Sequence, residues 1–331
     1  MIGGPSRGRG APTRSLTNAL EAIAIFVRGG LDESRFPFPR SLVPELFVNP
    51  HLPNYFVECG DVSSAATARS YIAEYEDAKV ITFPNFRPKI DLDFWSGLDV
   101  DKYPSLKKYS FYLDGDDLCD ARQQASGLAS RGVDADLAEE IAQQFRDTLT
   151  ALMPVYRSIF SDYVFDEGRK KIVWRLNTIM NENMHVDTYR EETNDHFARM
   201  FVNLDNQPRI WHTSWPIDDM IRQLDGKIPA ERLAGMTRGE VWSEINRSIF
   251  GKSSREWWDG QPRHVAYFQP GDVWIVDSRQ VAHQIFYGRR ALSIDFSLPK
   301  ERMKNPDRHY LEIANRFMAA GTGKLASAPA A

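Results

Sequence analysis

The sequence contains few cysteines, no stretch long enough to cross a membrane and no excess of basic charge. Its two cysteines, Cys59 and Cys119, form no CxxC pair, which argues against a disulfide framework and a cysteine-rich metal site. The 41 Lys and Arg against 45 Asp and Glu give a formal net charge of −4, without the basic footprint of a nucleic-acid-binding protein. No apolar run reaches the length of a transmembrane helix. We therefore expect a cytoplasmic protein with no nucleic-acid partner.

The rest of the composition is that of a globular protein. Hydrophobic residues make up 42% and charged residues 26% of the 331 positions, a balance that supports a buried core. Residues 1–14 are rich in Gly, Pro, Arg and Ser and are predicted to be a disordered tail. Residues 321–331 are predicted to be a second, flexible tail. Residues 15–320 show no internal repeat or compositional boundary, which favours a single domain.

The first half of this domain combines helical and strand patterns. Residues Ala65–Glu76 predict a helix, and Lys79–Phe83 and Lys108–Leu113 predict strands. Apolar residues at helical spacing over Leu137–Ile159 predict a long amphipathic helix, and Asp134 stands where its N-cap belongs. We expect this helix to pack along one face of a sheet.

From residue 171 the sequence changes to short runs rich in β-branched and aromatic residues, separated by turn signals. Seven runs are predicted strands: Ile172–Ile179, Ala198–Asp205, Arg209–Thr213, His264–Phe268, Val273–Val276, His283–Phe286 and Ala291–Leu298. Residues 218–260 form a charged insertion with a helical pattern. This arrangement favours a double-stranded β-helix, a jelly-roll or cupin-like barrel, over a parallel sheet. The predicted fold class is mainly β with flanking helices, N-terminal α/β elements and a helical insertion.

His185, Asp187 and His283 are the candidate metal ligands. In an extended segment, residues two apart face the same side, so His185 and Asp187 present an imidazole and a carboxylate together. Apart from His185 and His283, the sequence has five histidines, and none of them is followed by a carboxylate two positions later. Two imidazoles and one carboxylate form the facial triad that suits iron(II), a chelating cosubstrate and dioxygen. The alternative is that these residues are hydrogen-bonded polar groups at a strand end.

A 2-oxoglutarate cosubstrate also needs a buried cation for its distal carboxylate, and the planar fork of Arg binds both oxygens. Arg199 begins an otherwise apolar strand and is the preferred candidate; Arg290, with Ser293 close behind it, is the second choice. Asn177 and Asn203 are uncharged hydrogen-bonding residues on neighbouring strands. Their contact with a cosubstrate or substrate and their use as edge or turn caps are equally favoured.

Several ordered motifs are similar to those of one known family. They are Trp174-Arg175, His185-Val186-Asp187, Arg199 before Phe201 to Asn203, Trp274 to Val276, and His283. The sequence over residues 70–318 resembles the Kdo hydroxylases, which act on 3-deoxy-D-manno-oct-2-ulosonic acid in the lipopolysaccharide inner core. This resemblance implies a double-stranded β-helix dioxygenase that uses iron(II), 2-oxoglutarate and O2 to hydroxylate a sugar carbon. The first 60 residues have no recognised counterpart.

An anionic sugar substrate would be approached by basic and aromatic side chains. Arg175, Arg209, Trp211 and His212 are the candidates. For the arginines the alternative is a salt-bridged surface position, and for the tryptophan it is core packing.

Two other functions fit the same residues. The first is the same chemistry on a free amino acid or natural-product intermediate. The second is a cupin-like barrel that binds a metal or sugar without oxygen chemistry, although a buried cation opposite the metal is not needed there. The partner is expected to be a small molecule or a glycolipid. Peripheral contact with a membrane and the oligomeric state are left open.

Overall fold

The computed structural model describes residues 45–60, 65–113, 121–166, 170–176, 183–187, 195–224, 238–250 and 261–322, and the single residues 62, 228, 232 and 236. The predicted N-terminal tail, residues 15–44 of the predicted domain and residues 323–331 of the predicted C-terminal tail lie outside this part. So do Asn177 and Cys119.

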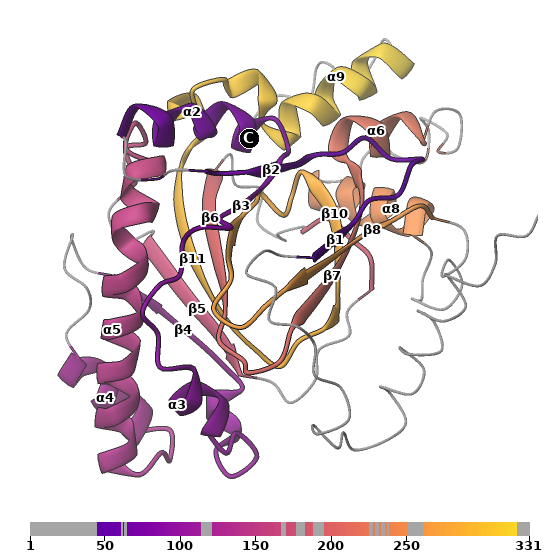
Figure 1. The fold of residues 1–331 in the computed structure, drawn as a ribbon. Helices are drawn as coiled ribbons and strands as arrows, with labels where there is room; N and C mark the ends of the chain where they lie inside the picture. Colours follow the sequence, from indigo (N-terminus) through magenta and orange to yellow (C-terminus); the bar gives the residue numbers. More distant parts are fainter. Residues whose placement is uncertain are drawn as a thin grey trace, which may run out of the picture. The chain divides into compact units, whose positions relative to one another are not determined.

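Two sheets form the framework of the described chain (Figure 1). The smaller sheet has the strand order β1 (Glu45–Phe47), β8 (His264–Phe268), β7 (Arg209–Pro216) and β10 (Val281–Tyr287). The larger sheet has the order β2 (Phe56–Glu58), β3 (Val80–Thr82), β9 (Val273–Ile275), β6 (Asp195–Asn203), β11 (Arg290–Pro299), β5 (Lys170–Leu176) and β4 (Lys108–Tyr112). Every pairing is antiparallel except that of β2 with β3.

The chain passes between the two sheets in the order of a double-stranded β-helix. After β5 in the larger sheet, His185 forms an antiparallel bridge with His283 of β10 in the smaller sheet. The chain then enters β6 in the larger sheet, β7 and β8 in the smaller, β9 in the larger, β10 in the smaller and β11 in the larger. The predicted fold class, mainly β with a jelly-roll barrel and flanking helices, is confirmed.

Each predicted strand has a counterpart in the described chain, most with shifted ends; residues 177–179 of the predicted Ile172–Ile179 strand lie outside the described part. The His264–Phe268 strand matches its prediction, whereas β7 continues three residues further, to Pro216. Strand β6 begins at Asp195, before the predicted start at Ala198, because the polar residues Asp195 and His196 still pair with β11. Backbone pairing thus extends strands beyond the apolar runs that identify them in the sequence.

Helices cover the outer faces of the sheets. They are α2 (Ala65–Glu76), α3 (Leu92–Gly97), α4 (Ala121–Ala129), α5 (Ala135–Ile159), α6 (Ile217–Arg222), α8 (Arg238–Phe250) and α9 (Tyr310–Thr322), with 3-10 turns η2 (Pro104–Leu106), η3 (Lys300–Arg302) and η4 (Pro306–Arg308). Helix α5 runs beside β4 and β5 in Figure 1, and its apolar stripe shares one buried core with the larger sheet. Among the described helices, none has the length and apolar character needed to span a bilayer.

The start of α5 differs from the prediction in one respect. Asp134 occupies the N-cap position, but its side chain makes no capping hydrogen bond. It accepts instead from the hydroxyl of Tyr103 and from Lys102 Nζ at 3.3 Å. Asp134 therefore ties α5 to the preceding segment instead of capping its own helix.

The predicted insertion at residues 218–260 is mostly helical where it is described, in α6 and α8. Helices α6 and α8 form a second apolar cluster together with α9, and Met184 and Val186 are buried in the same cluster. The insertion therefore packs behind the segment that carries His185 and Asp187.

The turn between β8 and β9 holds a buried carboxylate. Gly271 has a φ of +78°, which favours glycine at this position. The next residue, Asp272, accepts a hydrogen bond from Gln269 N (2.7 Å) and lies 3.0 Å from Arg87 Nη1. Burial raises the pKa of Asp272 to about 6, although Arg87 opposes this rise.

We expect this carboxyl to give the protein a pH-dependent stability. A raised pKa in the folded state stabilises the fold below the unfolded pKa, and that contribution is lost as pH rises through about 6. The free energy of unfolding of wild type relative to Asp272→Asn should fall by about 2 kcal/mol between pH 4 and pH 7. Denaturant titrations across this range measure it, and Arg87→Met should move the transition to higher pH. Parallel curves for wild type and Asp272→Asn would contradict this assignment.

Candidate metal centre

The structure brings the three predicted ligands together. One ligand atom from each of His185, Asp187 and His283 lies within 4.8 Å of the other two. The backbones of His185 and His283 exchange two hydrogen bonds, of 3.0 and 2.8 Å, and Asp187 N donates to Ser278 O at 2.9 Å. Strand β10 and the loop before it therefore hold the His-Val-Asp segment in place.

Both imidazoles are oriented by their own backbone. His185 Nδ1 lies 2.6 Å from Asn183 O, and His283 Nδ1 lies 3.0 Å from Val281 O. Because a carbonyl only accepts hydrogen bonds, each Nδ1 carries a proton, and in the neutral ring Nε2 then keeps its lone pair. Burial lowers the pKa of His283 to about 4, with a smaller contribution from His185, so this ring is neutral at neutral pH. The Trp211 ring stacks on His283 with the centroids 5.2 Å apart.

The two oxygens of Asp187 face different partners. Oδ1 lies 3.4 Å from His185 Nε2, whereas Oδ2 accepts from Ser278 Oγ at 2.6 Å and from the Arg199 guanidinium. Burial alone would raise the pKa of Asp187, but Arg199 and the two histidines hold it well below its usual range. Arg199 Nε also lies 3.2 Å from Asp295 Oδ1, on the residue opposite it in β11. Arg199 is thus engaged by two carboxylates beside the predicted ligands.

A cavity between the sheets is lined at one end by two of the three predicted ligands, Asp187 and His283. Strands β5, β6 and β11 of the larger sheet form one wall, and β7 and β10 of the smaller sheet form the other. Its lining side chains are Val173, Arg175, Asp187, Arg199, Phe201, Arg209, Trp211, Ser278, His283, Ile285, Ala291, Leu292, Ser293 and Asp295. Ser293 Oγ also donates to Asp295 Oδ2 at 3.3 Å.

Arg209 lies at the other end of this cavity from the predicted ligands. His283 pairs with Thr213 and Ile285 pairs with Trp211, so Arg209 is further along β7 than either partner. It is 3% exposed and passes over the backbone of Gly288, where a Cβ atom would lie 2.8 Å from Arg209 Cγ. Because Gly288 in the β10–β11 turn has no side chain, the Arg209 side chain can pass over its backbone. Arg175 is also displaced from the metal end, because it pairs with Ala291 instead of with Asp295.

Arg290, the second-choice cation from the sequence, is not among the side chains that line the cavity. Alternate residues of β11 face opposite sides, so Arg290 points away while Ala291 and Ser293 point inward. Its guanidinium donates to Leu98 O at 3.1 Å and lies 3.6 Å from Asp205. A one-residue difference in strand position separates this Arg from the cavity.

Asn203 and His212 also lie outside the lining of this cavity; Asn203 has the capping role that the sequence equally favoured, and His212 faces away. The Asn203 amide donates to Gln207 O (2.9 Å) and Phe268 O (3.0 Å), so it caps a turn. His212 follows Trp211 on β7 and faces the other side of the sheet, where it stacks on Phe286 with centroids 4.5 Å apart. Burial, together with Arg263, lowers its pKa to about 4. Neither residue lines the described cavity.

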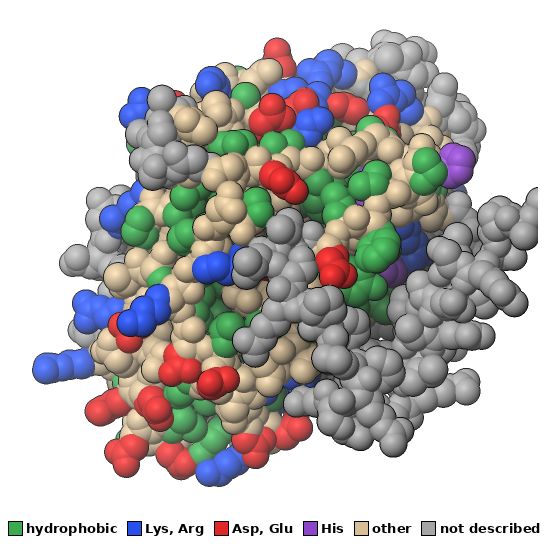
Figure 2. Space-filling view, viewed as in Figure 1, with side chains coloured by type: hydrophobic (Ala, Val, Ile, Leu, Met, Phe, Trp, Pro, Cys, Tyr) green, Lys and Arg blue, Asp and Glu red, His purple; other side chains and the backbone are tan. Residues whose placement is uncertain are grey.

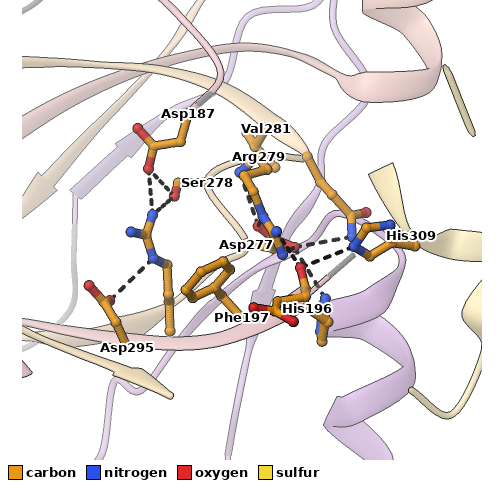
Figure 3. A network of polar contacts seen from close by, with 12 residues as sticks. Asp187, His196, Phe197, Asp277, Ser278, Arg279, Val281, Asp295 and His309 are labelled. Carbon is orange, nitrogen blue, oxygen red and sulfur yellow. Dashed lines mark hydrogen bonds and ion pairs between the residues drawn. The ribbon is translucent and has the colours of Figure 1, made fainter. Parts of the chain in front are cut away.

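The loop that carries Ser278 is fixed by buried charges, which Figure 3 shows beside the site. Asp277 pairs with Arg279 Nε and Nη2, both at 3.2 Å, and lies 3.4 Å from His196 Nδ1. The Arg279 guanidinium lies over the rings of Phe197 (4.5 Å) and Tyr310 (4.6 Å). Burial would raise the pKa of Asp277, but Arg279 and His196 hold it well below its usual range.

Sequence reasoning missed this loop. The one available signal was an Asp-Ser-Arg run, at 277–279, between two apolar strands. Charged residues in such a position are usually solvent-exposed, so the run did not stand out. In the structure Asp277 and Arg279 are buried, and Ser278 between them contacts Asp187 through both its backbone and its side chain.

Comparisons with known proteins agree with this architecture. The family model of the 3-deoxy-D-manno-oct-2-ulosonic acid (Kdo) hydroxylases matches residues 59–320. No curated protein sequence matches the chain. Among solved structures, the Kdo hydroxylase KdoO, a non-haem Fe(II) α-ketoglutarate-dependent dioxygenase, is similar in its complex with succinate and Fe(III). That match has 18% identity and a TM-score of 0.60 and covers 83% of this chain and 100% of KdoO.

Two further structures of KdoO are similar in the same way. The complex with α-ketoglutarate and Fe(III) has 19% identity and a TM-score of 0.57, over 79% of this chain and 95% of that chain. The complex with cobalt(II) has 18% identity and a TM-score of 0.58, over 83% and 100%. At these identities the likeness establishes the fold.

The buried Asp277–Arg279 pair leads to a stability prediction. Asp277→Ala should lower the free energy of unfolding by about 3–5 kcal/mol, because it leaves the Arg279 charge buried without its partner. Asp166→Ala, which removes the partly exposed pair with Arg302, should cost less than about 1 kcal/mol. Urea unfolding of both variants measures the difference. Equal losses in the two variants would show that the buried ion pair contributes no more to stability than the partly exposed pair.

Proposed function

Because this chain belongs to the family of Kdo hydroxylases, we propose that it is an iron(II)- and 2-oxoglutarate-dependent hydroxylase whose metal is held by His185, Asp187 and His283. One observation carries the ligand assignment: one nitrogen of each imidazole and a carboxylate oxygen lie within 4.8 Å of one another, beside a cavity that Asp187 and His283 line, while both Nδ1 atoms face backbone carbonyls. Two imidazoles with one carboxylate are the donor set that suits non-haem iron(II) and leaves positions for other ligands.

When bound, iron(II) with 2-oxoglutarate and O2 supplies the oxidising chemistry that hydroxylates a C–H bond, with succinate and carbon dioxide as the other products. The protein itself positions the reactants and shields them from water. Phe201, Trp211 and Ile285 make the middle of the cavity apolar and exclude water from it. Trp211, stacked on His283, also restrains the orientation of that imidazole.

Arg209 is the cation that we assign to the distal carboxylate of 2-oxoglutarate. It is buried at the end of the cavity away from the predicted ligands, which suits a cosubstrate that binds the metal with one end and a cation with the other. Arg199, the first choice from the sequence, instead contacts Asp187 and Asp295 at the metal end. The Ser293 hydroxyl lines the same cavity, and it would donate to the cosubstrate by turning from Asp295, to which it donates at 3.3 Å.

The charges around the cavity favour an anionic substrate. The described lining includes three arginines and two carboxylates. A divalent metal and a doubly charged cosubstrate balance each other, so the loaded cavity keeps an excess positive charge. This supports a Kdo-type sugar acid of the lipopolysaccharide inner core, presented as a glycolipid to a cytoplasmic enzyme. Arg175 is the lining arginine that we assign to this substrate.

The metal assignment is tested without substrate. Anaerobic addition of iron(II) and then 2-oxoglutarate to the purified protein should produce a visible metal-to-ligand charge-transfer band. His283→Ala should lack the band while retaining its fold by circular dichroism. A folded, metal-loaded wild type without the band would contradict the oxygenase and favour a barrel that binds metal or sugar without oxygen chemistry.

The cosubstrate assignment has its own test. Arg209→Gln should weaken 2-oxoglutarate binding to the metal-loaded protein by about 30- to 100-fold, since a charge-assisted contact is worth about 2–3 kcal/mol. Its cobalt(II) affinity should stay unchanged, because Arg209 is remote from the predicted ligands. Arg290→Gln, which alters an arginine outside the cavity, is the matched control. Weakened 2-oxoglutarate binding in Arg199→Gln, with none in Arg209→Gln, would return the role to Arg199.

A further inference from the structure

The helical insertion backs the metal-binding segment on the side away from the cavity. Met184 and Val186 alternate with the ligands His185 and Asp187, so their side chains face the opposite side. Both are almost fully buried, at 2% and 1% exposure, in the apolar cluster that α6 and α8 form with α9. Trp242 of α8 belongs to that cluster. The insertion thus supplies the apolar support for a segment whose other face carries the predicted ligands.

A second contact joins the insertion to the backbone of the same segment. Asn246 of α8 accepts a hydrogen bond from Val186 N through Oδ1 (3.0 Å) and donates to Val186 O through Nδ2 (3.1 Å). The backbone groups of His185 and the amide of Asp187 bond in the other direction, to His283 and Ser278. One amide side chain therefore satisfies both peptide groups that face away from β10, as a neighbouring strand would.

We infer that Asn246 is a positioning residue for the metal site, and that the insertion closes the free edge of the metal-binding segment. The inference rests on the proposed function, since it concerns how the metal ligands are held. A segment at a sheet edge exposes N–H and C=O groups that exchange with water, and its register is weakly fixed. Clamping Val186 restricts the two residues that flank it, and these are His185 and Asp187.

Helix α8 is itself anchored where Asn246 reaches the segment. Glu244, two residues earlier, is 1% exposed and pairs with Arg247 (2.6 Å) and Arg232 (2.7 Å). At the end of the helix, Gln261 Nε2 donates to Ile249 O at 3.1 Å. A side chain from an anchored helix loses little further freedom when it binds, so the clamp is preorganised.

The test compares Asn246→Ala with Ser248→Ala, which removes an exposed hydroxyl on the same helix together with its 3.4 Å hydrogen bond to Glu244, and leaves the Glu244 ion pairs in place. Cobalt(II) is titrated anaerobically into each protein and followed by visible absorption. Asn246→Ala should bind cobalt(II) about 10- to 100-fold more weakly than wild type, the range seen when the supports of metal ligands are removed. Ser248→Ala should bind within twofold of wild type. Hydrogen exchange of the Val186 amide should accelerate in Asn246→Ala only.

The possible outcomes distinguish a failure of this inference from a failure of the proposed function. Cobalt(II) affinity unchanged in folded Asn246→Ala overturns the positioning role, even if its thermal stability falls. If that variant does not fold, Asn246→Gln takes its place: weaker cobalt(II) binding with faster Val186 exchange supports the role, and wild-type values for both overturn it. Failure of the wild type to bind cobalt(II) would instead overturn the proposed function.

Discussion

The backbone pairing of His185 with His283 is the contact on which the site depends. It joins two segments that are distant in the sequence and sets their ring centroids 4.7 Å apart. Because side chains alternate along an extended chain, a slip of one residue would turn His185 and Asp187 out of the cavity and Met184 and Val186 into it. A single β-bridge fixes this register only weakly. The structure adds Ser278 on one side of the segment and Asn246 on the other, so the register is held from both edges.

The alternation of side chains along the strands also places the charged residues of the cavity at positions that suit different roles. Arg199 and Arg209 both face inward, but they lie near opposite ends, and each is held by a different device. Arg199 is fixed by an ion pair with Asp295, its register partner on β11. Arg209 is confined by close packing over Gly288 in the β10–β11 turn. A cation tied to carboxylates at the metal end is poorly suited to bind a further anion, whereas Arg209 lies at the far end of the cavity, where the distal carboxylate of a metal-bound cosubstrate would lie. Position along the cavity, and not the mere presence of buried arginines, distinguishes their roles.

Sequence patterns predicted the barrel and its three candidate ligands because these depend on local features. Short β-branched runs identify strands, and His-Val-Asp places two side chains on one face. The positions of the other candidate residues relative to the cavity depend on register. Arg290 and His212 stand on real strands, yet a shift of one position decides which face each occupies, and strand ends in the sequence are uncertain by more than that. Asn203 was a cap, which no pattern distinguishes from a ligand contact. Asn246 was unpredictable, since its partner Val186 is 60 positions away.

The buried pair of Asp277 and Arg279 shows why a site of this kind retains charges that cost stability. Apolar packing would fill the same space and stabilise the fold at least as well, but it is non-directional. Ser278 must place both a carbonyl and a hydroxyl on Asp187, which requires its loop in one conformation. Ion pairs and cation–π contacts to Phe197 and Tyr310 define that conformation by direction as well as by distance. Tyr310 begins α9, so the C-terminal helix takes part in holding the loop. The order of the site is thus supported from outside the barrel, by α8 against Val186 and by α9 beneath Ser278.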